Sequence, residues 1–246
     1  ITKANPANFS FETHLTTEKD ENIVLELLTD YDTSSGEQLL KSFDMYVVSN
    51  TQTLKIEGCV LTQGEIRFAK ENHLILAVSG NGKKLERVGD ENYSLPGSLQ
   101  SASATRTPTT PVLDVEVGGS DVTNLAAATL SVQNNIEWTP YETLQNSLDV
   151  TSASNAMYPS SYSLTDRVVS GNITQFYSSA NESEFQTFNT NTSVRIKTLV
   201  NGSTFFDANL SGCMFTKRSA PGEVYTQTYD YRLVTSPSDL GTIITY

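Results

Sequence analysis

The side chains best suited to chemistry in this chain of 246 residues are few and widely spaced. There are two histidines, His14 and His73, and two cysteines, Cys59 and Cys213. His14 lies in an alternating apolar and polar stretch and His73 beside a predicted turn. We therefore expect both to be structural or surface residues rather than general bases. A zinc site would need four ligands, and no CxxC or HxxxH spacing supplies them, so no metal site is predicted.

Three short patterns resemble functional loops only superficially. GNGKK at 80–84 lacks the GxxxxGK[ST] spacing of a phosphate-binding loop and is predicted to be a turn. DYDTSSGEQLLK at 30–41 begins like a calcium loop, but Gly36 is seventh instead of sixth and Lys41 replaces the bidentate Glu. No GxSxG nucleophile elbow occurs. Scattered carboxylates leave a glycosidase pair open, yet no catalytic, cofactor-binding or metal-binding residue is predicted, and we expect no enzyme.

The two cysteines lie in similar octapeptides, IEGCVLTQ at 56–63 and LSGCMFTK at 210–217. Gly, Cys and Thr are identical in the two stretches, and the apolar positions match in class. The match favours an internal duplication, although coincidence stays open. Equivalent positions in two copies would lie far apart, whereas a disulfide needs Cα atoms within about 7 Å. We therefore expect two free thiols, each a small apolar residue in its own strand.

Composition narrows the class of protein. Hydrophobic residues make up 37% of the chain, and its many Ser and Thr residues favour strands and turns over long helices. The net charge of −12 argues against a protein that binds the phosphates of nucleic acids. No apolar run approaches the ~20 residues of a membrane helix. The first residues lack a signal-peptide layout, and two cysteines suit a reducing compartment.

Hydrophobic periodicity predicts mainly strands in the first half. The segment 21–28 is the exception: it predicts a helix with Asp20 as N-cap and with Ile23, Leu27 and Leu28 on one face. Strands are predicted at 9–15, 43–49 and 53–61, followed by an antiparallel hairpin of 65–69 and 73–79 around the turn KEN.

The second half repeats this order, with a short helix at 182–188 and strands at 168–179, 193–200, 205–215 and 224–234. An extra strand is predicted at 128–138. Between the halves, 98–121 is rich in Ser, Thr, Pro and Gly, which is typical of a linker or extended arm. The predicted organisation is a first β domain at 1–100, a linker at 101–120, and a second β domain at 121–246. The second domain carries a long polar loop, 139–166, of a length typical of functional or partner-binding loops.

The run TLSVQNNIEW…YETL…YPSSYSLTDRVVSGNITQFYSS resembles the major tail tube proteins of long-tailed (siphovirus-type) bacteriophages. That family has a strand ending in an Asn-Asn turn, an extended loop, and a strand of the type R-x-V-S-G-x-x-T. Arg167, Val169, Ser170, Gly171 and Thr174 match the last motif. A short helix then follows in the family, as ESEFQTF would here. The segments FSFETHL and IEGCVLTQGEIRF look like the opening of larger members.

The resemblance implies a mainly β fold: a β-sandwich or barrel of the tail-tube type with a short helix per copy, possibly in two tandem copies. It implies a structural protein of the virion tail, assembled in the host bacterial cytoplasm, that needs no cofactor. Units would self-associate edge to edge into rings, and the rings would stack with other tail proteins into a tube. Double-stranded DNA would pass through the lumen without specific binding. A negative lumen would repel phosphate, and Glu57, Glu65 and Glu71 are candidates to line it.

The number of chains per ring depends on the duplication. A family ring is commonly six domains around, so one domain per chain implies a hexamer, whereas two fused domains imply a trimer with pseudo-sixfold symmetry. An alternative function is a β-rich fibre, adhesin or carbohydrate-binding module, and an enzyme on a β-sandwich is a third. A secreted module should show a signal sequence and often an exposed aromatic platform, but Trp138 is the single Trp of the chain. Negative-stain microscopy would separate hollow tubes or rings from fibres and monomers.

Overall fold

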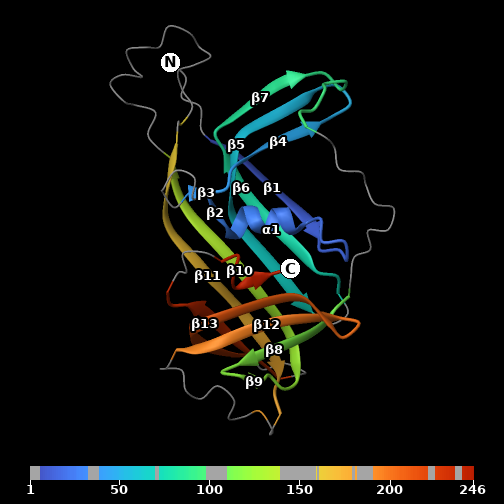
Figure 1. The fold of residues 1–246 in the computed structure, drawn as a ribbon. Helices are drawn as coiled ribbons and strands as arrows, with labels where there is room; N and C mark the ends of the chain where they lie inside the picture. The colour runs from blue at the N-terminus through green and yellow to red at the C-terminus, as the bar shows by residue number, and fades with distance from the viewer. Residues whose placement is uncertain are drawn as a thin grey trace.

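The structure, a computed structural model, describes residues 6–32, 39–69, 72–97, 110–138, 159, 161–178, 181, 191–220, 225–235 and 240–246. These residues form a mainly antiparallel β fold with one short helix, which confirms the predicted fold class (Figure 1). Within the described segments, no helix is long and apolar enough to span a membrane.

The first half contributes one helix and seven strands: β1 (Ala7–His14), α1 (Asn22–Thr29), β2 (Tyr31–Asp32), β3 (Leu39–Leu40), β4 (Phe43–Val48), β5 (Thr53–Ala69), β6 (Ile75–Gly82) and β7 (Lys84–Gly89). The second half contributes β8 (Val112–Val117), β9 (Ser120–Asp121), β10 (Leu125–Trp138), β11 (Tyr162–Phe176), β12 (Thr192–Val200), β13 (Ser203–Ala220), β14 (Thr226–Leu233) and β15 (Ile244–Thr245). The predicted hairpin is confirmed, because β5 and β6 pair antiparallel.

Seven strands lie side by side in what we call the main sheet, in the order β1-β6-β5-β10-β11-β14-β13, and each pairs antiparallel with the next. Two of them continue beyond it. The first part of β5 pairs with β4 and β7 in a distal sheet at the upper end of the molecule (Figure 1). The first part of β13 pairs with β12, which leads on to β8 and β9 in a cover sheet that crosses the lower part of the main sheet (Figure 1).

The two Gly-Cys octapeptides lie where these long strands change sheets. Cys59 pairs with Phe43 of the distal sheet, and the next residue, Val60, pairs with β6 of the main sheet. Cys213 pairs with β12 on one side and β14 on the other. The preceding Gly58 and Gly212 have φ of 60° and 83°, a conformation that glycine adopts at little cost and that bends a strand. The repeated sequence therefore marks a repeated bend.

The two halves also share their strand pairing. In the first, β1 pairs with β6, β6 with β5, and β5 with β4. In the second, β11 pairs with β14, β14 with β13, and β13 with β12. The extra strand β10 lies between the two sets and pairs with β5 and β11. This correspondence supports an internal duplication, but the division into two domains stays a prediction, and the helix predicted at 182–188 lies outside the described residues.

The segment predicted as a linker, 101–120, is partly a strand. Residues 101–109 lie outside the described residues, but β8 begins at Val112 and pairs with β12. Val115 and Val117 are buried, so VLDVEV alternates as a half-buried strand should. The high content of Pro, Gly, Ser and Thr in the surrounding segment favoured a linker, and the short alternating stretch within it was therefore not predicted as a strand.

One core cluster lies between the main sheet, α1 and the cover sheet. Phe68 of β5 and Phe206 of β13 meet there with ring centroids 5.3 Å apart. Helix α1 packs on β5 at Gly64, where a Cβ would lie 2.2 Å from Leu28 Cδ2. Only a glycine leaves room for the helix at this point.

The helix was predicted correctly in place, and its inner face in part: Leu28 is buried and Leu27 packs against the core, as predicted, but Ile23 does not. Its buried residues are Leu25, Leu28 and Thr29, whereas Ile23 is 63% exposed. Several apolar stripes fit a helix this rich in Ile, Val and Leu, and the contact with Gly64 selects one of them. The N-cap is Glu21 rather than Asp20, without a side-chain cap bond. The Glu21 carboxylate instead accepts hydrogen bonds from the backbone N–H and the hydroxyl of Thr16.

Both cysteines are free and fully buried, which confirms the prediction of two free thiols. Burial raises the pKa of each thiol to about 11. Because only the thiolate attacks a disulfide reagent, both thiols should react with DTNB at pH 8 at least about 100-fold more slowly in the folded protein than in urea. Absorbance of the released thionitrobenzoate measures this. A thiol that reacts at the unfolded rate would contradict the buried positions.

Candidate functional site

The face of the main sheet that points away from the core is polar across its whole width. Strand register places side chains in rows across the sheet, because alternate residues share a face. One row crosses all seven strands with Glu12, Ala77, Glu65, Ser131, Ser170, Arg232 and Met214. The next row does so with His14, Ile75, Arg67, Thr129, Asn172, Asp230 and Thr216.

Two further rows, one on each side, cross five strands each. They contain Ser10, Ser79, Gln63, Gln133 and Val168 in one row, and Ala69, Ala127, Thr174, Thr228 and Arg218 in the other. No residue of the four rows is buried, so the described elements leave this face uncovered. We call these four rows the polar face. Most of its side chains are small hydroxyl, amide or methyl groups.

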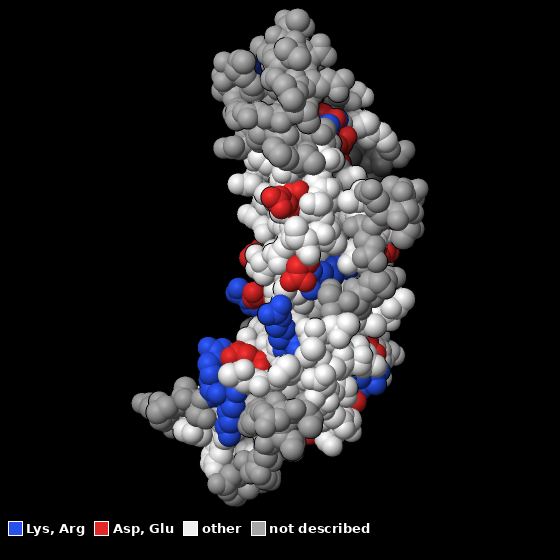
Figure 2. Space-filling view, turned by 90° about the vertical axis from the view of Figure 1, so that its left-hand side faces the viewer, with Lys and Arg blue, Asp and Glu red and all other residues white. Residues whose placement is uncertain are grey.

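Charge on the polar face is balanced, with three acidic residues, Glu12, Glu65 and Asp230, and three basic ones, Arg67, Arg218 and Arg232. Arg67 pairs with Glu65 and Arg218 with Asp230, and each carboxylate's hydrogen bond raises the pKa of its arginine. On the side of the molecule in Figure 2, most basic side chains lie in the lower half beside acidic ones.

Of the three glutamates predicted to line a lumen, the two that are described, Glu57 and Glu65, lie in different sheets. Glu65 is on the polar face. Glu57 lies in the distal sheet, where it pairs with Lys84 across the strands. Glu71 lies outside the described residues. Alternation of Ser and Thr along the strands, rather than acidic residues, was the signal that could have identified this face.

The main sheet has two open edges among the described residues. Strand β1 pairs only with β6, and residues 214–220 of β13 pair only with β14. Six successive antiparallel pairings separate these edges, so both edge strands run in the same direction. Open edges present unpaired N–H and C=O groups and are a template for pairing with another chain.

On the core side of the main sheet, Tyr231 connects β14 to β10 across the intervening β11. Its hydroxyl on β14 donates to the carbonyl oxygen of Thr129 on β10, 2.7 Å away, and so crosses β11 at Gly171. A Cβ at Gly171 would lie 2.0 Å from that carbonyl oxygen and 2.4 Å from the tyrosine hydroxyl. Thr174 Oγ1 lies 3.1 Å from Thr228 Oγ1 of β14. The motif residues Gly171 and Thr174 therefore hold β10, β11 and β14 in register.

The motif residue Arg167 is buried, only 3% exposed, beneath the end of α1. Its Nε donates to Asn134 Oδ1 at 2.7 Å, and its Nη1 donates to the carbonyl oxygen of Thr29 at 2.8 Å. Asn134 Nδ2 in turn donates to the carbonyl oxygens of Leu28 and Leu61, each at 3.0 Å. The last carbonyls of a helix lack internal partners and favour a positive charge. Arg167 and Asn134 supply both the donors and the charge.

The resemblance implied an Asn-Asn turn, but the strand predicted at 128–138 is confirmed and continues through both asparagines. Asn134 and Asn135 lie within β10, which continues to Trp138 with a register shift after Asn135. A turn asparagine bonds its own local backbone. Asn134 instead directs its amide to Leu28 and Leu61, so the strand goes on.

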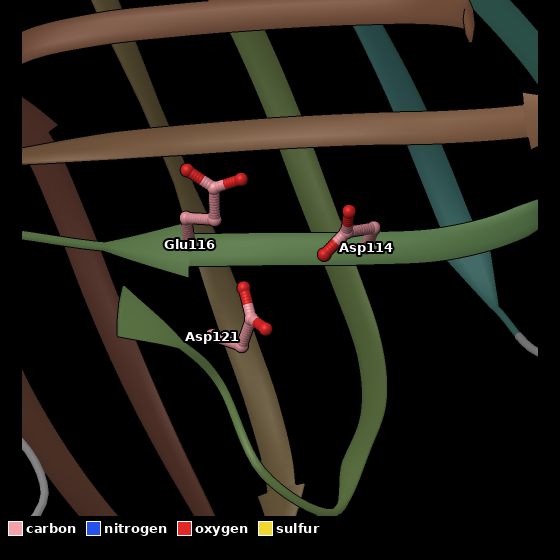
Figure 3. A group of neighbouring side chains, drawn as sticks. All are labelled: Asp114, Glu116 and Asp121. Atoms are coloured by element: carbon pink, nitrogen blue, oxygen red, sulfur yellow. The ribbon is translucent and has the colours of Figure 1, made fainter. Parts of the chain in front are cut away.

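Three carboxylates of the cover sheet, Asp114, Glu116 and Asp121, have oxygens within 4.8 Å of one another. Figure 3 shows Asp114 and Glu116 on β8 and Asp121 reaching toward them from β9. Lys197 Nζ lies 2.7 Å from Asp114 Oδ2 and 3.5 Å from Glu116 Oε1. The pKa of Lys197 is raised by its hydrogen bond to Asp114. The lysine offsets part of the acidic charge, and the cluster is an ion-pair network of the sheet surface.

Of the remaining sequence candidates, the two loop-like segments form no site in the described residues, whereas the two histidines lie close together. GNGKK spans the end of β6 and the start of β7, which pair with different parts of β5, and it does not precede a helix. The calcium-like segment contains β2 and β3, with 33–38 outside the described residues. In contrast, His14 and His73, which we had treated separately, lie together with ring centroids 6.0 Å apart.

A family model described as the Bacteriophage Baseplate Tube Protein Family matches residues 1–246. Among curated proteins, no sequence matches this chain.

Replacing Arg167 with Met should lower the free energy of unfolding by about 3 kcal/mol, because buried carbonyls of α1 and the Asn134 amide lose a charged donor. Urea denaturation measures this. The matched control is Arg195→Met, because Arg195 pairs with Asp207 on the partly exposed surface of the cover sheet and should contribute less than about 1 kcal/mol. Equal losses in the two variants would show that burial of Arg167 is unimportant.

Proposed function

The chain belongs to the bacteriophage baseplate tube protein family, and we propose that it forms rings which stack into a tube that conducts DNA during ejection. The observation that carries the proposal is the polar face: a sheet seven strands wide that no described element covers on one side, with an edge at each margin that no described strand pairs. Such a sheet can continue from one chain into the next and so enclose a lumen.

Ring closure would bring β1 of one chain beside residues 214–220 of its neighbour. Rotation about the tube axis preserves strand direction, so these two edges would pair in parallel. The contact is heterologous, and its repetition around the axis closes a ring. Near the β13 margin, Arg232 of β14 lies one strand in from the edge and in the same row as Met214 of β13, and the neighbour's β1 margin carries Glu12. Opposite charges at the two margins favour this pairing over like-to-like contact.

Sheet geometry favours three chains per ring over six. Three chains of seven strands supply twenty-one strands. With strands spaced about 4.8 Å apart and tilted about 40°, these enclose a circle about 40 Å across between backbones. Side chains then leave a lumen that matches duplex DNA. Six chains would leave one about twice as wide, with DNA far from the wall. A trimer also agrees with the shared pairing of the two halves, since three chains would supply six equivalent units.

A wall of hydroxyl, amide and methyl groups suits the passage of DNA. Phosphate binds proteins chiefly through Lys and Arg, and counterion release makes each such contact favourable. On the polar face Arg67 and Arg218 are already paired with carboxylates, which weakens that attraction. The expectation of a net negative lumen stays a prediction. Because the four rows carry equal numbers of acidic and basic residues, the negative charge of such a lumen would have to come from other residues, with Glu71 as a candidate.

Within the virion tail, the family description favours the tube section of the baseplate, whereas the sequence resemblance favours the long tail tube of siphovirus-type phages. Assembly in the host cytoplasm with other tail proteins fits either location. Electron microscopy of the purified chain separates them. A protein of the long tube should polymerise into long tubes by itself, but a baseplate protein should stop at single or few rings.

Proline at Ser10 should abolish ring formation. The backbone N–H of Leu15 donates to the carbonyl of Leu74, and β1 pairs with β6 without a register shift, so N–H groups of alternate residues such as Ser10 point to the open edge. Ser10→Pro therefore removes an edge donor but no bond within the chain. We expect a folded monomer with a circular dichroism spectrum like that of the unchanged protein, and no rings in negative stain.

The control is Ser10→Thr, which keeps the N–H and the hydroxyl and should assemble normally. Normal rings from Ser10→Pro would show that β1 is not a ring contact and would overturn the proposed closure. Analytical ultracentrifugation of the assembled protein then gives the number of chains, and six per ring would overturn the trimer alone.

A further inference from the structure

The sequence contains two Asn-Gly dipeptides, at 81–82 and at 201–202, and the fold places them in opposite surroundings. The second dipeptide forms the whole turn between β12 and β13, because Val200 pairs with Ser203 across it. Its asparagine has a φ of 51° and its glycine a φ of 78°, as the two-residue hairpin turn of type I′ requires. Both residues are exposed.

This turn brings an electrophile and a nucleophile together in adjacent residues. The electrophile is the side-chain amide carbon of Asn201, Cγ, and the nucleophile is the backbone nitrogen of Gly202. A bond between them closes a five-membered ring, and glycine has no side chain to hinder its own nitrogen. A Cβ built at Gly202 would meet no atom within 4 Å, so the turn has room for the rotation that ring closure needs.

The first dipeptide is held in a strand. Asn81 is paired on both sides, with Asn8 of β1 and with Val60 of β5. A Cβ built at Gly82 would lie 2.2 Å from Cγ2 of Ile56, so the backbone has little room to move here. Ring closure at Asn81 would have to bend the chain out of this ladder. The tip of a hairpin, in contrast, opens with little loss of structure.

We infer that Asn201 is a site of spontaneous deamidation, with water as the co-reactant. The backbone nitrogen of Gly202 forms a bond to Cγ of Asn201, and the Cγ–Nδ2 bond breaks. The proton of the attacking N–H leaves with the amide group as ammonia. Water then opens the succinimide ring at either carbonyl. One opening gives aspartate, and the other gives isoaspartate, in which the main chain continues through Cβ and Cγ.

Either product replaces a neutral amide with a carboxylate and so makes the net charge of −12 more negative by one. Isoaspartate also lengthens the turn by one backbone atom. Because residues 201–204 are all exposed, the core should be retained. The turn lies at the opposite end of β13 from residues 214–220, and the inference needs one chain only. It therefore does not depend on ring assembly.

The test is incubation of the purified chain at mildly alkaline pH, followed by digestion and peptide mapping by mass spectrometry. In the folded chain, Asn201 should convert at least about tenfold faster than Asn81, because a turn opens at a lower free energy than paired strands do. In urea the two rates should be equal, since both asparagines precede glycine. The peptide that spans Asn201 should give two products of equal mass, the aspartate and isoaspartate forms.

Ion-exchange chromatography of two variants gives a second readout. Asn201→Gly keeps a residue that tolerates a positive φ but removes the side-chain amide. It should lack the acidic species that forms first in the unchanged protein. The matched control is Asn81→Gln, which changes the protected dipeptide and should form that species at the unchanged rate.

Three outcomes would overturn the inference. The first is an intact Asn201 in the folded chain after a time in which the chain in urea has fully converted. The second is an equal rate at Asn201 and Asn81 in the folded chain. The third is persistence of the first acidic species in Asn201→Gly.

Discussion

The buried guanidinium of Arg167 is the contact on which the arrangement of the molecule depends. A charged side chain that is 3% exposed needs hydrogen-bond partners, and the last carbonyls of a helix need donors. Here each satisfies the other. Through Asn134, the same cluster binds the carbonyl of Leu61 on β5. Residues far apart in the sequence, from α1, β5, β10 and β11, are thereby fixed at one point. With α1 held on the core side, the opposite face of the main sheet is left free of described elements.

Four glycines make this arrangement possible, two because they lack a Cβ atom and two because they adopt a positive φ. Gly64 and Gly171 lack the Cβ that would collide with Leu28 and with Tyr231, so a helix and a tyrosine can approach the sheet backbone closely. Gly58 and Gly212 instead supply a positive φ at the bends of β5 and β13. The adjacent Cys59 and Cys213 are both fully buried. Each octapeptide therefore combines a glycine of positive φ with a buried cysteine at the point where its strand changes sheets.

Strand positions could be predicted from the sequence, because alternation directly encodes which face is buried. The bends could be located as a repeat, but only the pairing of β5 and β13 with two sheets each reveals what the repeat does. Three features could not be predicted. The helix face depends on Gly64, which is 36 residues beyond Leu28 in sequence. The burial of Arg167 depends on carbonyls that only the folded chain brings to it. The pairing of the two histidines depends on the register of β1 and β6.

The number of strands in the main sheet has a mechanical consequence for the proposed ring. Inside the chain, β10 lies between the two similar sets of strands and pairs antiparallel with both. Between chains no described strand fills the equivalent place, and seven strands, an odd number, make the direct contact parallel. Parallel pairing is slightly less stable per residue than antiparallel pairing. Each proposed ring would therefore have three seams that are weaker than the wall between them. The core cluster, in contrast, is formed by residues of a single chain, so the proposed seams would add to a core that does not depend on them.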